Sequence, residues 1–125
     1  MHYEGADILI SGGEDNYIKI WNIMKSEGER LITSIENGHV DRINAMIPYK
    51  FTNIGTFITA SSDKTIQMWN PDCKKSIKMF LGHKKPVRCL SKVKLNTEVV
   101  IISGSEDKTL KVWNPNENKD KLMLC

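Results

Sequence analysis

Several features that mark common protein classes are missing from this 125-residue sequence. The longest aliphatic run is the four residues VVII, whereas a membrane helix needs about 20 apolar residues. The N-terminus lacks the basic segment and long apolar segment of a secretory signal peptide. No stretch longer than about ten residues keeps a helical period of 3.6. We therefore expect no membrane insertion, no long helix, and an intracellular location, cytoplasmic or nuclear.

Cysteines are few and the net charge is low, and both observations argue against further classes. Cys73, Cys89 and Cys125 are odd in number and include no CxxC pair, so they indicate neither a disulfide framework nor a zinc site. The net charge of +3 is mild, and no aromatic residues interleave the basic ones as they do in nucleic-acid platforms. We therefore expect reduced thiols, no metal, no cofactor and no nucleic-acid partner.

What the sequence contains is a repeat. In three segments a Ser or Thr precedes an Asp by four residues, and the Asp precedes a Trp by six: SGGEDNYIKIWN from 11, TASSDKTIQMWN from 59 and SGSEDKTLKVWN from 103. The pairs Gly38-His39 and Gly82-His83 precede the second and third segments, and each His lies 30 residues before the Trp of its unit. A repeat of this length indicates a modular architecture.

Each unit is predicted to be a small antiparallel sheet. The runs ILISGG, TFITASS and VVIISGS are rich in β-branched residues, and each is followed by an Asp-containing turn and an alternating segment: YIKIW, TIQMW and TLKVW. RLITSI, SIKMFL, INAMI and VRCLSKV supply further strands. Because the first runs are apolar at consecutive positions, both faces should be buried between neighbouring units. The predicted class is all-β, with units stacked like the blades of a propeller.

The joint pattern of Gly-His, about thirty residues and then Asp-x-x-φ-x-φ-Trp-Asn resembles the WD-repeat family of β-propellers over nearly the whole chain. The last residue of the family motif is usually Asp, but here it is Asn22, Asn70 and Asn114. The resemblance implies a structural tetrad, in which an indole bonds a hydroxyl, the hydroxyl bonds a His, and the His bonds the turn Asp. The tetrads map to His39, Thr59, Asp63 and Trp69, to His83, Ser103, Asp107 and Trp113, and, without a His, to Ser11, Asp15 and Trp21.

Ser, His and Asp can also form a hydrolase triad. Here the hydroxyl is expected to bond an indole, so it is not presented to a substrate. No glycine elbow of the G-x-S-x-G type is present, and the set recurs in tandem. We therefore expect a structural network and no enzyme activity in this chain.

The unit boundaries predict one partial propeller over 1–125. Strands are lettered a to d within a blade. The first blade, 1–35, should hold only strands b to d; the second spans 36–80; the third spans 81–125, with its last strand incomplete in KLMLC. Four extra residues in the first blade are assigned to the c–d loop MKSEGE, a surface insertion.

Propellers close with typically 4 to 8 blades, so this chain is not expected to close a ring alone. Three explanations stay open. The chain is a segment of a longer protein, several copies form one ring, or the chain completes a partner's ring or remains open.

The resemblance implies a protein-interaction scaffold or adaptor. The alternative is the substrate-recognition segment of a larger enzyme assembly, such as a ubiquitin ligase or signalling complex. In the family, contacts often come from the third and fifth residues after the Gly-His histidine and from the residue before the turn Asp, which is Glu14 in the first blade. With nearby lysines, these positions define a basic rim suited to an acidic peptide, a phosphorylated motif or a ubiquitin-like surface. We call the following ten residues the rim: Arg42, Asn44, Ser62, Lys64, Lys84, Lys85, Pro86, Arg88, Glu106 and Lys108.

Overall fold

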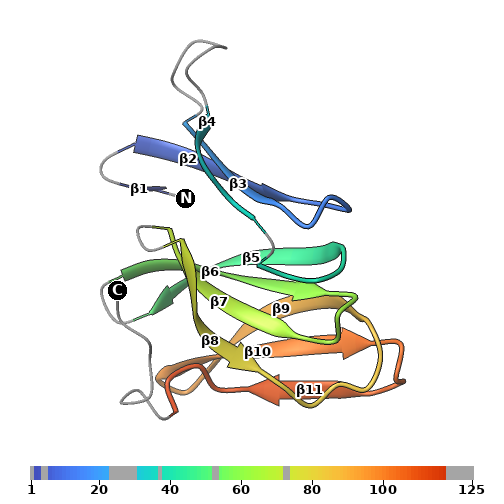
Figure 1. Ribbon diagram of the computed structural model, residues 1–125. Helices are drawn as coiled ribbons and strands as arrows, with labels where there is room; N and C mark the ends of the chain where they lie inside the picture. The colour runs from blue at the N-terminus through green and yellow to red at the C-terminus, as the bar shows by residue number, and fades with distance from the viewer. Residues whose placement is uncertain are drawn as a thin grey trace.

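Three antiparallel sheets follow one another along the chain in the computed structural model, which describes residues 2–3, 6–22, 31–36, 38–51, 54–71 and 74–117 (Figure 1). The first sheet consists of β1 (His2–Tyr3), β2 (Ala6–Gly12), β3 (Ile18–Asn22) and β4 (Leu31–Ile35). The second consists of β5 (Ile43–Phe51), β6 (Ile54–Ser61), β7 (Ile66–Asn70) and β8 (Lys75–Phe80). The third consists of β9 (Val87–Leu95), β10 (Glu98–Ser105) and β11 (Leu110–Trp113).

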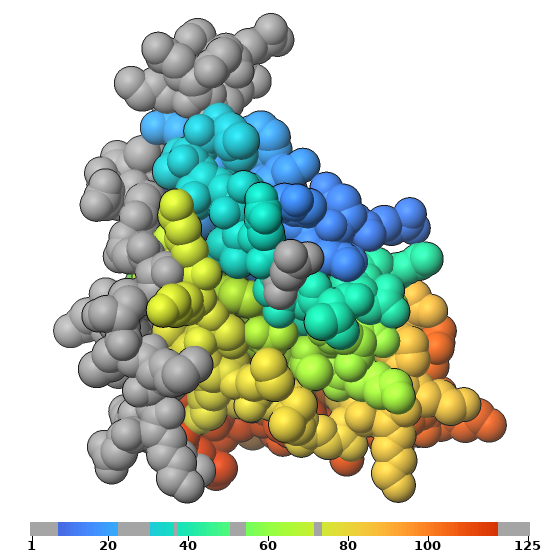
Figure 2. Space-filling view, viewed as in Figure 1, coloured from blue at the N-terminus to red at the C-terminus, as the bar shows by residue number. Residues whose placement is uncertain are grey.

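Each sheet forms one blade, and the predicted all-β class of antiparallel sheets is confirmed. Neighbouring strands in sequence are neighbours in each sheet, because short turns join antiparallel partners. Figure 2 shows the blades stacked in chain order, from blue to red. Within the described part of the chain, no helix has the length and apolar character needed to cross a bilayer.

The turns between strands b and c share one backbone form. The residue after each turn Asp has a positive φ, 64° at Asn16, 76° at Lys64 and 67° at Lys108. The Asp carboxylate accepts a hydrogen bond from the backbone N–H two residues later, at 3.2 Å in the first blade and 2.9 Å in the other two. Asp favours such a turn because its short side chain can bond its own backbone.

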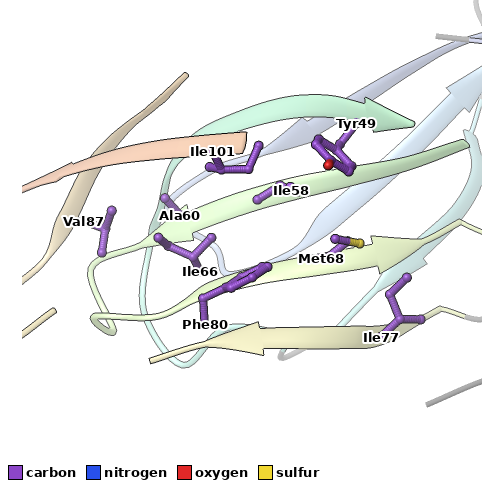
Figure 3. Packing of buried hydrophobic residues seen from close by; sticks show 9 residues of the cluster. All are labelled: Tyr49, Ile58, Ala60, Ile66, Met68, Ile77, Phe80, Val87 and Ile101. Atoms are coloured by element: carbon purple, nitrogen blue, oxygen red, sulfur yellow. The ribbon is translucent and has the colours of Figure 1, made fainter. Parts of the chain in front are cut away.

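The middle blade is buried on both faces. Every residue of β6 from Thr56 to Ser61 is buried, as the consecutive apolar run predicts. One face packs against the first blade in a cluster of Ile8, Ile18, Ile20, Ile35, Ile43, Phe57 and Trp69. The other face packs against the third blade in the cluster drawn in Figure 3: Tyr49, Ile58, Ala60, Ile66, Met68, Ile77, Phe80, Val87 and Ile101.

The two end blades each leave one face open. Val112 precedes the tryptophan of β11 and is 63% exposed, whereas Met68, at the same position of β7, is 0% exposed. Leu9 pairs with the tryptophan of β3 and is 55% exposed, whereas Phe57, at the same position of β6, is 1% exposed. Burial of these positions therefore depends on a neighbouring blade, which only the middle blade has on both sides.

The first blade departs from the prediction in one respect. We expected strand a to be missing, but His2–Tyr3 forms β1 and pairs with Asp7 and Ala6 of β2. This strand has two residues, compared with nine in β5 and in β9. Two residues are too few to carry a hydrophobic period, so the pattern could not reveal them. The predicted strand in KLMLC and the loop MKSEGE lie outside the described residues.

Candidate functional site

In the second blade, four side chains form a continuous chain of hydrogen bonds. Trp69 Nε1 donates to Thr59 Oγ1 at 2.8 Å, and this hydroxyl lies 2.6 Å from His39 Nε2. His39 Nδ1 lies 2.8 Å from Asp63 Oδ2. Because the hydroxyl accepts from the indole, it donates its own O–H hydrogen bond to Nε2 of the imidazole, and the N–H at Nδ1 then donates to the carboxylate. The imidazole, hydroxyl and indole are all buried.

The third blade repeats this chain with the same distances. Trp113 Nε1 donates to Ser103 Oγ at 2.8 Å, Ser103 Oγ lies 2.6 Å from His83 Nε2, and His83 Nδ1 lies 2.8 Å from Asp107 Oδ2. Ser103 is fully buried, and its hydroxyl already accepts from the indole and donates to the imidazole. A nucleophile has to be presented beside its base, so this geometry favours a structural network over a hydrolase triad.

The first blade holds a reduced version. Trp21 Nε1 donates to Ser11 Oγ at 2.8 Å, but no histidine among the described side chains bonds this hydroxyl. The turn carboxylate of Asp15 instead lies 3.4 Å from Lys19 Nζ. Its side chain is 53% exposed, compared with 5% for Asp63 and 9% for Asp107. The missing imidazole therefore leaves the turn of this blade open to solvent.

The network includes two threonines that the sequence analysis missed. Thr65 Oγ1 donates to Asp63 Oδ1 at 2.6 Å, and Thr109 Oγ1 donates to Asp107 Oδ1 at 2.5 Å. Each turn carboxylate is thus held by a hydroxyl as well as by an imidazole. The repeat could have revealed them, because the two threonines are 44 residues apart, as the two histidines are. In the first blade this position holds Tyr17.

Two serines, also missed, tie each b–c turn to the loop that joins neighbouring blades. Ser61 Oγ donates to the carbonyl of Arg42 at 2.9 Å, and Ser105 Oγ donates to the carbonyl of Pro86 at 2.9 Å. Each hydroxyl also accepts the backbone N–H of the turn Asp at 3.1 Å. Gly13 takes this position in the first blade. These serines therefore fix the d–a loop against the b–c turn in the second and third blades.

The carboxylates of the two complete tetrads are stabilised in their charged form. Burial alone would raise the pKa of Asp63, but hydrogen bonds from His39 and Thr65 outweigh it and hold this pKa far below its usual range. At Asp107 the hydrogen bond from Thr109 is the largest cause of a similarly lowered pKa, and partial burial opposes it. Both groups therefore stay anionic at neutral pH and act only as acceptors.

A close approach explains why glycine precedes the first tetrad histidine. A Cβ atom on Gly38 would lie 2.4 Å from Cη2 of Trp69. The Gly38 carbonyl also accepts a hydrogen bond from Gln67 Nε2 at 2.8 Å. The loop backbone thus rests directly on the indole, and only a residue without a side chain fits there.

The rim residues lie where the d–a loops meet the b–c turns. The backbone N–H of Ser62 donates to the Arg42 carbonyl at 3.0 Å, and that of Glu106 donates to the Pro86 carbonyl at 3.0 Å. These bonds bring residues distant in sequence to one edge of the stack. Three rim residues are partly buried, Asn44, Ser62 and Pro86; the others are exposed, namely Arg42, Lys64, Lys84, Lys85, Arg88, Glu106 and Lys108.

Both rim arginines already have acidic partners. Arg42 Nη1 lies 3.3 Å from Glu14 Oε1 of the first blade. Arg88 Nε donates to Glu106 Oε1 at 2.9 Å, and its Nη2 contacts the same oxygen. All four side chains are at least 44% exposed, and exposed pairs contribute only about 0–1 kcal/mol. The arginines are thus held in place but can exchange these carboxylates for another acidic group.

Asn44 has a structural role that the sequence analysis did not anticipate. Its Nδ2 donates to Ser62 Oγ at 3.0 Å and to the carbonyl of Val87 at 2.8 Å. The second bond crosses from the second blade to the third. Asn44 therefore helps to fix the relative position of two blades at the rim through its Nδ2 group.

Metal and thiol chemistry find no support in the described part of the chain. None of its His, Cys, Asp and Glu side chains are grouped in threes at positions that could hold a metal ion. The thiol of Cys89 is free and exposed.

Comparison with known families agrees with this geometry. The family described as WD domain, G-beta repeat matches residues 4–22, 29–70 and 74–114. Each of the last two matches begins with the outer strand of the preceding blade, β4 or β8, and ends with a tryptophan-bearing strand, β7 or β11. The chain belongs to the WD-repeat family. WD-repeat domains in general mediate protein–protein interactions.

Similar proteins carry such repeats within much longer chains. A guanine nucleotide-binding protein subunit beta-like protein of Encephalitozoon cuniculi (strain GB-M1) is 31% identical over 103 residues, covering 80% of this WD-repeat chain and 30% of that protein. Human kinesin-like protein KIF21B is 33% identical over 98 residues, which cover 71% of this chain and 6% of that protein. Human WD repeat-containing protein 41 is 30% identical over 86 residues, which cover 65% of this chain and 18% of that protein. The chain therefore spans less than a third of the length of these relatives.

Proposed function

We propose that this chain is part of a protein-interaction scaffold whose rim binds an acidic peptide or protein surface, with no catalysis of its own. The observation that carries the proposal is the fixed geometry of the rim. In both the second and the third blade, a buried tetrad and a serine hydroxyl fasten the d–a loop to the b–c turn. A preorganised surface loses less conformational entropy on binding than a mobile loop does.

The charge of the rim supports an acidic partner. Six of its exposed side chains are cationic, while the exposed Glu14, Asp41 and Glu106 nearby offset part of that charge. Arginine and lysine both bind carboxylates and phosphates through charge-assisted hydrogen bonds. Arginine is also enriched in protein interfaces. Arg42 and Arg88 are therefore the expected anchors, each leaving its present carboxylate for one on the partner.

Charge reversal at the two arginines tests this proposal. Arg42→Glu combined with Arg88→Glu places two more carboxylates beside those already there, so the variant should repel an acidic ligand. Binding of a fluorescent deca-glutamate peptide to the 125-residue chain can be followed by anisotropy. We expect a loss of at least about tenfold in affinity, since two charge-assisted contacts are removed.

The control variant makes a charge change of the same size at the opposite end of the second blade. Lys74→Glu combined with Lys75→Glu alters two exposed lysines at the start of β8, remote from the d–a loops. This variant should bind the peptide within about twofold of the parent chain, because rim contacts are untouched. An equal loss in both variants, or no peptide binding by the parent chain, would contradict the assignment to the rim.

The exposed faces of the first and third blades are relevant to how the scaffold would be extended by further blades. We expect the isolated chain to associate, because exposed apolar sheet faces favour contact with further blades. Size-exclusion chromatography with light scattering measures this directly. A stable monomer with a cooperative melting transition would overturn that expectation. The short span relative to its relatives also suits a recognition segment of a larger assembly, for which co-purification of a catalytic subunit is the distinguishing result.

A further inference from the structure

We propose that a cavity between the second and third blades, remote from the rim, binds a small multivalent anion of the polyphosphate class. The cavity has a volume of about 300 Å³ and is lined by Tyr49, Lys50, Lys92, Lys94 and Val99. It lies toward the C-terminal ends of the inner strands β5 and β9, which run side by side (Figure 1). The d–a loops and the rim are at the N-terminal ends of the same strands.

The strands direct three ammonium groups to one place. Lys92 and Lys94 are two residues apart on β9, and residues with this spacing project from the same face of a strand. Lys50 comes from the end of β5 in the neighbouring blade. Lys92 Nζ also donates to the Pro48 carbonyl at 3.2 Å, which holds this side chain across the boundary between the blades.

The apolar part of the cavity is rigid. Tyr49 is 3% exposed, and its hydroxyl donates to the Val99 carbonyl at 2.7 Å. Asn116 Nδ2 lies 3.2 Å from the same hydroxyl. The tyrosine thus spans both blades and keeps the gap between them at a fixed width.

Among the described residues, the three cavity lysines lack the ion pairs that Lys19 and the two rim arginines have. Lys19, Arg42 and Arg88 each have a carboxylate within 4.0 Å. Among the described residues, no carboxylate lies that close to the ammonium groups of the cavity. The nearby Glu98 accepts a hydrogen bond from Asn114 at 2.9 Å instead.

This arrangement creates a local excess of positive charge. The three ammonium groups line one cavity and their side chains are exposed, so solvent and salt screen part of their mutual repulsion. An anion with several charges relieves this repulsion at all three groups at once, whereas a single carboxylate matches only one.

The side-chain types favour phosphate over other anions. Lysine binds phosphate as a point charge, while planar carboxylates are better matched by the arginine fork, and no arginine lines this cavity. The aromatic ring is buried, so it offers no exposed face on which a nucleobase could stack. Linked phosphates without a base, as in tripolyphosphate, therefore fit both the charge and the volume.

Calorimetric titration of the 125-residue chain with inorganic tripolyphosphate tests the site. We expect saturable 1:1 binding that weakens as salt rises. Lys92→Gln combined with Lys94→Gln should lower the affinity at least about tenfold, because it removes two charge-assisted contacts. The matched variant Lys74→Gln with Lys75→Gln removes the same charge at the start of β8, the edge strand opposite β5 in the second sheet, and should leave the affinity within about twofold.

Each alternative result has a definite meaning. Equal losses in the two double variants would show diffuse attraction to a basic protein and overturn the proposal, as would equally tight binding of sulfate or the lack of saturable binding. Preference for a phosphoserine peptide over tripolyphosphate would assign the cavity to a protein partner and would also overturn the proposal.

Circular dichroism checks that each variant folds. If the Lys92→Gln, Lys94→Gln variant fails to fold, Lys50→Gln on the other blade must reproduce the loss of tripolyphosphate affinity. Deca-glutamate binding at the rim is measured separately, so the two proposals can fail independently.

Discussion

Two serines at equivalent positions offer a direct measure of what the complete tetrad contributes. Ser103 bonds both Trp113 and His83, whereas Ser11 bonds only Trp21. Replacing either serine by alanine removes the same atom. Any difference in the free energy of unfolding between the two variants therefore reports the surroundings of that hydroxyl.

The structure gives the expected magnitudes. Ser103→Ala removes one indole bond with a net value of about 0.5–1.5 kcal/mol and leaves a buried imidazole nitrogen unpaired, which costs about 1–3 kcal/mol. The side chain of His83 is 1% exposed, so water cannot replace the lost partner. The total is about 1.5–4.5 kcal/mol. Ser11→Ala removes only an indole bond in a partly exposed setting, with a loss of about 0.5–1.5 kcal/mol.

Urea denaturation followed by far-ultraviolet circular dichroism measures both losses, with the same slope required for each variant. Ser103→Thr serves as a control, because Thr59 performs this role in the second blade and the hydroxyl is kept. The reasoning is refuted if the two alanine variants lose the same stability, or if Ser103→Thr is as harmful as Ser103→Ala.

Two further predictions concern the turns and loops of the tetrads. Folding lowers the pKa values of Asp63 and Asp107. The two carboxylates therefore add to the free energy of unfolding above the unfolded pKa of about 3.9, and this contribution is lost as pH falls below that value. Denaturation measured from pH 7 to pH 3 should show the loss, and the double variant Asp63→Asn with Asp107→Asn should no longer show it. Gly38→Ala should cost about 1–3 kcal/mol by forcing Trp69 aside, whereas Gly13→Ala, whose nearest atom is 4.0 Å away, should be nearly neutral by thermal melting.

The fold was predictable because several local signals recur together. A single Gly-His pair or a single Asp turn would carry little information, but their fixed separation from a tryptophan repeats along the chain. The b and c strands then follow from their apolar runs, and the d strands of the first two blades from the short segments after Trp21 and Trp69. The family match and the three antiparallel sheets confirm this reading.

Features that depend on contacts between blades were not predictable. The pairing of Arg42 with Glu14 joins residues 28 positions apart in different blades, and no pattern within one repeat encodes it. The bond from Asn44 to the third blade is of the same kind. The lysine cavity likewise exists only because β5 and β9 lie side by side. Local periodicity determines strands, but it does not determine which side chains meet across a blade boundary.

The exposed positions of Leu9 and Val112 give the stack a polarity. One end presents the indole-bearing side of a blade, and the other presents the aliphatic side, so two identical ends do not match. If such ends met, the contact would be head-to-tail, a kind of interface that repeats until a ring closes or continues as an open filament. The rotation between successive blades would then decide between a finite particle and a fibre, and a substitution at Leu9 or Val112 would change assembly without altering any rim residue.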